Sequence, residues 1–115
     1  MALYMFMGSY SHAAIKAIVE TGSDRESATR KAVEAAGGKL LGFYGMFGQE
    51  HNIVVIADMP GPAEYIAVVA TTILSGTIGS WKSIPLYTAA DLVKASEVAG
   101  KVKAAYVPPG GAHAV

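Results

Sequence analysis

Cysteine is absent from this chain of 115 residues. Without cysteine the protein has no disulfide framework, no thiolate nucleophile and no metal site built on sulfur. An excess of charge is absent as well, because nine basic side chains balance nine acidic ones. No cluster of Lys or Arg occurs, so neither a nucleic-acid backbone nor an anionic membrane surface is an expected partner.

The sequence also lacks an apolar run long enough to cross a membrane. A spanning helix needs about 20 apolar residues, whereas the most apolar segment, residues 63–74, is shorter and contains Glu64. Residues 1–10 are apolar but carry neither the basic segment nor the small-residue cleavage pattern of a secretory signal. We therefore expect a cytoplasmic protein with no membrane partner.

Apolar residues, by contrast, are abundant. They make up 52% of the chain, and charged residues make up 16%. The length suits one domain with one core, which we place at residues 1–103, before a flexible tail at residues 104–115. A compact monomer of this composition would leave much apolar surface in water, so we expect a homodimer or a higher homo-oligomer.

Residues 39–60 predict the β-hairpin around which the rest of the chain is arranged. The two arms of this segment are apolar and rich in aromatic or β-branched residues, and the short polar stretch at residues 48–50 is typical of a turn. A turn at this place predicts that Phe47 pairs near His51. It also predicts that Tyr44 lies near Val54 on the same face.

Helices and strands alternate on either side of this hairpin. Strands are predicted at residues 3–9, apolar on both faces, and at residues 78–87, an edge strand because it contains Pro85. Helices are predicted at residues 12–20, at 23–37 after a capping box that begins at Ser23, at 63–75, and at 88–99, where Gly100 ends the last one. Since nearly every residue of the helix at 63–75 is apolar, we expect it to be buried on more than one side.

This order of elements is that of the ferredoxin-like βαββαβ plan. The plan gives an α+β fold with a four-stranded antiparallel sheet and helices on one face, and this chain adds a C-terminal helix. Because the strands are apolar on both faces, a second copy of the same sheet is the simplest cover for the face without helices. The sequence therefore predicts a dimer in which two sheets face each other.

Four segments carry a resemblance to a known family. They read LYMFMGSYSHAAIK, GGKLLGFYGMFG, HNIVVIADMPGP and SIPLYTAADL, and together they resemble the GYD-domain family over residues 1–95. The resemblance implies the ferredoxin-like fold of the dimeric α/β-barrel group and at least a homodimer. It does not imply a reaction.

The chain departs from this family in the motif that names it. Members read Gly-x-Tyr-Asp before the third strand, whereas here His51 and Asn52 stand where the Tyr and Asp would fall. An amide cannot exchange a proton as a carboxylate can, so only His51 could take over acid/base chemistry from that aspartate. If the aspartate instead holds the turn through side-chain hydrogen bonds, Asn52 serves equally well, and we favour this structural interpretation.

The three histidines, His12, His51 and His113, have no partner at the spacing of metal ligands, so no metal site is expected. No phosphate-binding loop or other cofactor motif occurs either, so no cofactor is expected. His51 is the only catalytic candidate, because a strand end that faces the open side of the sheet would lie near a cleft. The alternative, which we favour, is a surface histidine beside a turn.

Aromatic residues on neighbouring strands suggest a binding site. If Tyr4, Phe6, Tyr44 and Trp81 face the same side, they line an apolar pocket between the sheets that suits a flat hydrophobic small molecule. Together with Asn52 they are the candidate ligand-binding residues. The alternative, that they are ordinary core or interface aromatics, is favoured.

Two functions from different classes follow from these patterns. The first is a homo-oligomeric binding or assembly module, which the apolar composition, the neutral charge and the loss of the motif aspartate favour. The second is a cofactor-independent enzyme of the oxygenase or isomerase type that acts on small aromatic or lactone-like substrates. The second rests on analogy with other proteins of the same fold.

Overall fold

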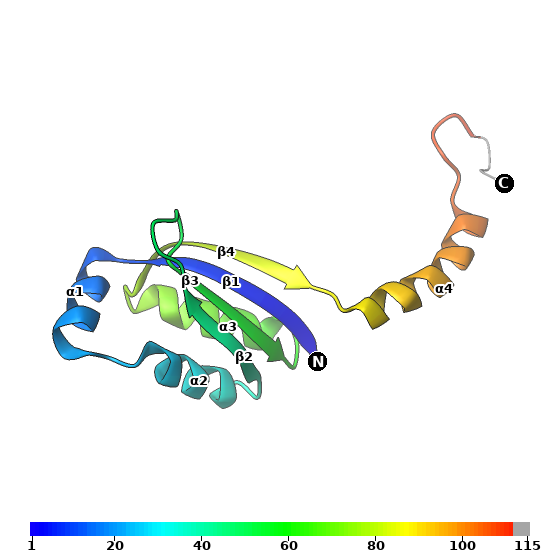
Figure 1. The fold of residues 1–115 in the computed structure, drawn as a ribbon. Coiled ribbons are helices and arrows are strands. Elements are labelled where there is room, and N and C mark those ends of the chain that lie inside the picture. The colour runs from blue at the N-terminus through cyan, green and yellow to red at the C-terminus, as the bar shows by residue number, and fades with distance from the viewer. Residues whose placement is uncertain (112–115) are drawn as a thin grey trace.

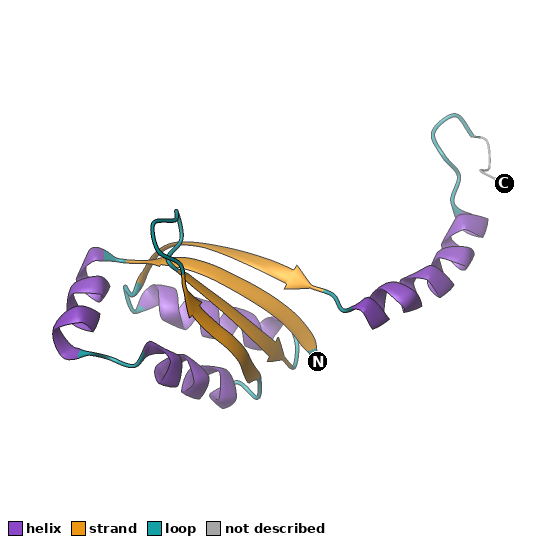
Figure 2. Cartoon of the chain, viewed as in Figure 1, coloured by secondary structure: helices purple, strands orange, loops and turns teal. Residues whose placement is uncertain are grey.

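The computed structural model of this chain describes residues 1–111. Within that range the elements follow the order β-α-α-β-β-α-β-α (Figures 1 and 2). The strands are β1 (Ala2–Tyr10), β2 (Lys39–Gly45), β3 (Ile53–Met59) and β4 (Ile78–Leu86). The helices are α1 (His12–Thr21), α2 (Arg25–Ala35), α3 (Pro62–Leu74) and α4 (Ala89–Ala105).

The four strands form one antiparallel sheet in the order β2-β3-β1-β4. β1 lies in the centre, between β3 and β4, and β2 and β4 are the two edges. α2 and α3 lie against one face of this sheet, and α1 lies at one end of it (Figure 1). The ferredoxin-like α+β fold that the sequence predicts is therefore confirmed.

β2 contains one bulge. Leu40 lies opposite Ala57, but Gly42 lies opposite Ile56, so β2 uses two residues where β3 uses one. Leu41 is the additional residue. A bulge of this kind reverses the face on which every later side chain of the strand lies.

The tip of the hairpin differs from the prediction, although its middle does not. Tyr44 lies opposite Val54, as expected. Phe47 and His51 do not pair, because the ladder ends before the loop at residues 46–52. The predicted pair of Phe47 and His51 is therefore wrong, and the loop is longer than the turn that the sequence suggested.

Alternation along the strands gives the sheet two different faces. The face under α2 and α3 carries the core, whose buried residues are Phe6, Val33, Leu40, Ile53, Val55, Ala57, Met59, Tyr65 and Ile78. We call the other side the open face. It carries Leu3, Met5, Met7, Ser9, Lys39, Tyr44, Val54, Ile56, Asp58, Ser80, Lys82, Ile84 and Leu86. No helix of residues 1–111 covers the open face (Figure 1).

α3 is less buried than the sequence predicts. Tyr65 is its buried residue, whereas Ile66 is 61% exposed and Leu74 is 86% exposed. The expectation that this helix is buried on more than one side is wrong for the single chain. α3 packs on the sheet through one side, and its outer side remains apolar and uncovered.

The start of α2 and the end of α4 also differ from the prediction. α2 is capped by Asp24, whose side chain accepts a hydrogen bond from the Ser27 N–H (3.1 Å), and not by Ser23. α4 continues through Gly100, because that glycine does not take the left-handed conformation with which Gly22 ends α1. The predicted tail at residues 104–115 therefore begins inside this helix.

α4 follows the end of β4 and lies apart from the sheet and from the other helices (Figure 2). None of its residues is buried. The longest dimension of the molecule is 64 Å, against 29 and 23 Å in the other two directions. We call α4 the arm. Among the described residues, no helix has the length and apolar character that crossing a bilayer requires.

Candidate functional site

Asn52 holds the hairpin loop against β1. Its N–H donates to the Gly8 carbonyl (2.9 Å), and its carbonyl accepts from the Met46 N–H (2.9 Å). Its side-chain Oδ1 accepts from the Tyr10 N–H (3.0 Å), next to an irregularity in the pairing of β1 with β4 after Ser9. A carboxylate oxygen would accept the same bond, so this geometry supports the structural interpretation of the position.

A second hydrogen bond ties the loop at residues 46–52 to β1. The Ser9 hydroxyl donates to the Glu50 carbonyl (2.6 Å). Gly48 takes a positive φ of 73°, which L side chains rarely adopt, and so lets the loop reverse direction. The loop is thus tied to β1, and the side chain of Phe47 is left fully exposed.

The histidines do not assemble a reactive site. His51 is half-buried in the loop, and His12 is exposed at the start of α1. Within residues 1–111, neither belongs to a metal-like group of His, Asp and Glu side chains, and the ion pair found there joins Arg30 to Glu26. His113 lies outside the described residues. His51 therefore has no carboxylate that would orient it for proton transfer.

The candidate aromatic residues do not share one face of the sheet. Tyr4 and Phe6 lie on the side of β1 that α2 and α3 cover. Trp81 lies opposite Gly8 and so belongs to the same side, half-exposed on the edge strand. Tyr44 lies on the open face, because the bulge in β2 turns it there. A single pocket lined by all four residues does not exist in this chain.

Tyr65 on α3 is a candidate site residue that the sequence analysis did not identify. Its ring stacks on Tyr4, with the ring centroids 4.1 Å apart, and its hydroxyl donates to the Ser83 Oγ on β4 (2.7 Å). Burial raises the pKa of Tyr65, although the hydrogen bond to Ser83 opposes this effect. One feature of the sequence could have indicated Tyr65. It is the only aromatic residue of α3, and the fold places α3 under the central strands.

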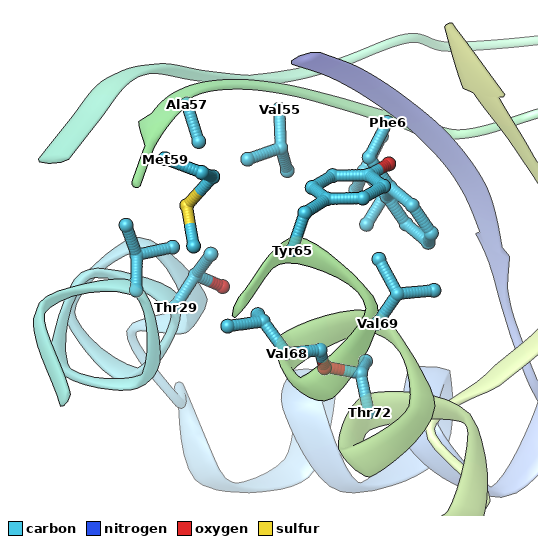
Figure 3. Close-up of a pocket in the computed structure, with 11 residues that line it drawn as sticks. Phe6, Thr29, Val55, Ala57, Met59, Tyr65, Val68, Val69 and Thr72 are labelled. Carbon is cyan, nitrogen blue, oxygen red and sulfur yellow. The ribbon is translucent and has the colours of Figure 1, made fainter. Parts of the chain in front are cut away.

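A small cavity lies beside Tyr65, between the sheet and helices α2 and α3 (Figure 3). Its volume is about 60 Å³. The lining is apolar apart from hydroxyl groups, and its labelled residues are Phe6, Thr29, Val55, Ala57, Met59, Tyr65, Val68, Val69 and Thr72. This cavity is on the helix side of the sheet and not on the open face, where a pocket between two sheets would form.

A wider hollow lies at the tip of the hairpin. It measures about 530 Å³ and is lined chiefly by Tyr10, Ile15, Met46, Phe47 and Asn52. Burial raises the pKa of Tyr10, and the charge of Arg25 opposes the shift. Tyr10 and Tyr65 are both protonated at neutral pH, so neither space contains a general base.

A comparison with protein-family models identifies the family of this chain. The model of the GYD domain matches residues 4–96, which covers the sheet except the first two residues of β1, helices α1 to α3 and the loop of Asn52. The chain belongs to the GYD domain family. No curated protein matches this GYD domain at a significant level. The match ends inside α4, so the second half of the arm lies beyond the part that matches the GYD domain.

Proposed function

We propose that this GYD domain is a homodimeric assembly and binding module in which the open faces of two copies pair about a two-fold axis. The composition of the open face supports the proposal most. Its apolar residues on β1, β3 and β4 are each half-buried in the single chain: Leu3, Met5, Met7, Val54, Ile56, Ile84 and Leu86. A two-fold axis lets the same patch cover itself.

The free energy available from the open face is comparable to the cost of association. At about 25 cal/mol per Å², covering several hundred Å² of apolar surface contributes on the order of 10 kcal/mol. Loss of translational and rotational freedom opposes this gain by roughly 4–15 kcal/mol. Pairing of the open faces is therefore favourable only if most of the face takes part.

Asp58 gives a second reason to expect a partner on the open face. Its Oδ1 is shielded from solvent and has no hydrogen-bond partner among residues 1–111. Asp58 lies opposite Leu3 on one side and Lys39 on the other. An unpaired buried polar group costs about 1–3 kcal/mol, and more when it is charged, so a donor from a second copy would stabilise the pair.

The cavity beside Tyr65 is the place we propose for a small apolar ligand. At about 60 Å³ it is less than half of the ~150 Å³ that admits benzene in a protein interior. A ligand would therefore bind only if α2 and α3 move apart. The alternative function, a cofactor-independent enzyme, gains no support from the described residues, because Asn52 and Tyr65 are engaged in structural hydrogen bonds.

Glutamate substitutions on adjacent residues of β3 test the pairing. Val54→Glu places a carboxylate on the open face, and we expect a folded monomer because an unpaired charge cannot be buried between two sheets. Val55→Glu places the same group in the core, and we expect an unfolded chain. Val19→Glu, at a position that is 76% exposed on α1, is the control that should remain dimeric.

Light scattering and circular dichroism measure mass and folding in these variants. The proposal requires a dimeric wild type and a monomeric, folded Val54→Glu protein at the same micromolar concentration. A wild-type protein that remains monomeric at about 100 μM, which corresponds to an association free energy weaker than roughly −5.5 kcal/mol, would refute it.

A further inference from the structure

The arm has an apolar stripe that is exposed in the described part of the chain. Leu92, Ala95, Ala99, Val102 and Tyr106 recur at alternating spacings of three and four residues, the pattern of one side of a packed helix. We call these residues the arm stripe. Lys94, Glu97 and Lys101 lie on the opposite side of the helix. Every residue of the stripe is exposed in the single chain.

The arm is not a helix that would be stable alone in water. Isolated helices are marginal up to a length of about 15 residues, and α4 has 17 residues with Gly100 near its middle. A glycine inside a helix costs about 1 kcal/mol relative to alanine, and no neighbouring atom lies within 4 Å of the position where a Cβ would be. The helix therefore needs a surface against which its stripe packs.

That surface is not on the same chain. The connection from β4 to α4 consists of Tyr87 and Thr88, and Thr88 is extended, with φ −91° and ψ 166°. The arm consequently continues beyond the end of β4 and does not turn back over its own sheet (Figure 1). It rises on the side away from α2 and α3, where a second copy on the open face would lie.

The area of the interface points to the same partner. Four strands about 4.8 Å apart and about 25 Å long cover roughly 500 Å², which is below the ~800 Å² that each partner of a stable complex buries. A helix of this length, about 26 Å long and 10 Å wide, adds roughly 260 Å². The open face and the arm together cover roughly 760 Å², close to the size of a stable dimer interface, whereas the open face alone covers roughly 500 Å².

We infer that the two arms are exchanged within the dimer, each packing through its stripe on the partner copy. The inference rests on the proposed pairing of the open faces and adds a second, separable contact to it. Leu92 and Ala95 lie within the GYD match and the other three stripe residues lie beyond it, so the match covers only part of this contact.

Two glutamate substitutions on the arm test the inference on the full chain. Ala99→Glu places a carboxylate in the stripe, and we expect it to weaken the dimer at least tenfold, which is about 1.4 kcal/mol. Ala104→Glu adds the same charge on the side of Glu97 and Lys101, away from the stripe, and should change the dissociation constant less than about twofold. Sedimentation equilibrium over a dilution series measures both constants. Equal constants for the two variants would overturn the exchange and leave the pairing of the open faces intact.

Hydrogen exchange in the wild type tests the exchange of the arms independently. We expect the amides of residues 92–105 to be protected at high concentration and to lose protection on dilution, because protection depends on the partner. Protection that persists after dilution has dissociated the dimer would place the arm on its own chain, and absence of protection in the dimer would leave the arm in solvent. Either result overturns the inference. A monomeric wild type would instead remove the proposed function on which the inference rests.

Discussion

The side chain of Asn52 joins the hairpin loop to the central strand through one hydrogen bond. Its Oδ1 accepts from the Tyr10 N–H in a partly buried bond. An aspartate at this position would offer an oxygen with the same reach. The amide therefore keeps the hydrogen bond that holds the loop but cannot transfer a proton as a carboxylate can.

Asn52→Ala should lower the free energy of unfolding by about 1–3 kcal/mol, because the Tyr10 N–H is left unpaired. Asn52→Asp keeps the acceptor and should stay within about 0.5 kcal/mol of the wild type. Urea denaturation measures both. If Asp destabilises the protein as much as Ala, the amide nitrogen and not the oxygen is the group that matters.

The bulge at Leu41 explains why the aromatic site could not be predicted from the sequence. Alternation places Tyr4 and Phe6 on the same side of β1, and the structure agrees. Tyr44 lies four residues after Leu40, so an unbroken strand would put both on the helix side. One additional residue moves Tyr44 to the open face, and nothing in the sequence marks its position except the nearby Gly42.

Among the elements, the arm has the best-defined start. The Thr88 hydroxyl accepts from the Asp91 N–H (3.1 Å), and the Asp91 carboxylate accepts from the Thr88 N–H (2.9 Å). The backbone bond from Thr88 lowers the pKa of Asp91 below its ordinary value of 3.8, and the Thr88 side chain and the charge of Lys94 act in the same direction, against desolvation. The ionised carboxylate is thus the form that the cap stabilises.

The pH dependence of the arm follows from this shift. A lowered pKa in the folded state means that the cap stabilises the helix above pH 3.8 and that this contribution is lost as the pH falls through the lower folded value. At neutral pH, Asp91→Ala should reduce the helical circular dichroism signal relative to the wild type. The difference between the two proteins should shrink as the pH falls through the lowered pKa of Asp91. A difference that does not shrink would mean that the carboxylate acts other than as an ionised cap.

Helix ends were predictable where glycine takes the left-handed conformation. Gly22, Gly37 and Gly76 all have positive φ and follow α1, α2 and α3, as their sequence contexts indicate. Gly100 has the same residue type and lies in the middle of α4. A single sequence does not distinguish a glycine that ends a helix from one that the helix passes through, because both conformations are open to it.

At the scale of the molecule, the hydrophobic pattern was sufficient to predict the sheet and its helices but not the placement of the arm. The order of strands follows from where apolar runs and turn residues occur, and those contacts lie within one chain. The arm has an exposed apolar stripe that requires a packing partner, and a hydrophobic pattern does not specify where on the molecule that partner lies.

The melting temperature of the wild type should depend on its concentration. If folding and pairing are coupled, a hundredfold increase in concentration stabilises the folded state by about 2.7 kcal/mol, which raises the melting temperature by several degrees for a dimer of this size. Scanning calorimetry at two concentrations measures the change. The Val54→Glu protein, which we expect to be monomeric, should melt at the same temperature at both concentrations.

The central position of β1 has a consequence for the order in which the protein is made. Of the four strands this one is synthesised first, yet its neighbours β3 and β4 are residues 53–59 and 78–86. During synthesis a strand that is apolar on both sides therefore stays unpaired until β3 and β4 have been made. Contacts between such distant segments slow folding to milliseconds or longer, and an unpaired apolar strand is prone to aggregate in that interval. Yield on expression should accordingly depend more on the residues of β1 than on those of any other strand.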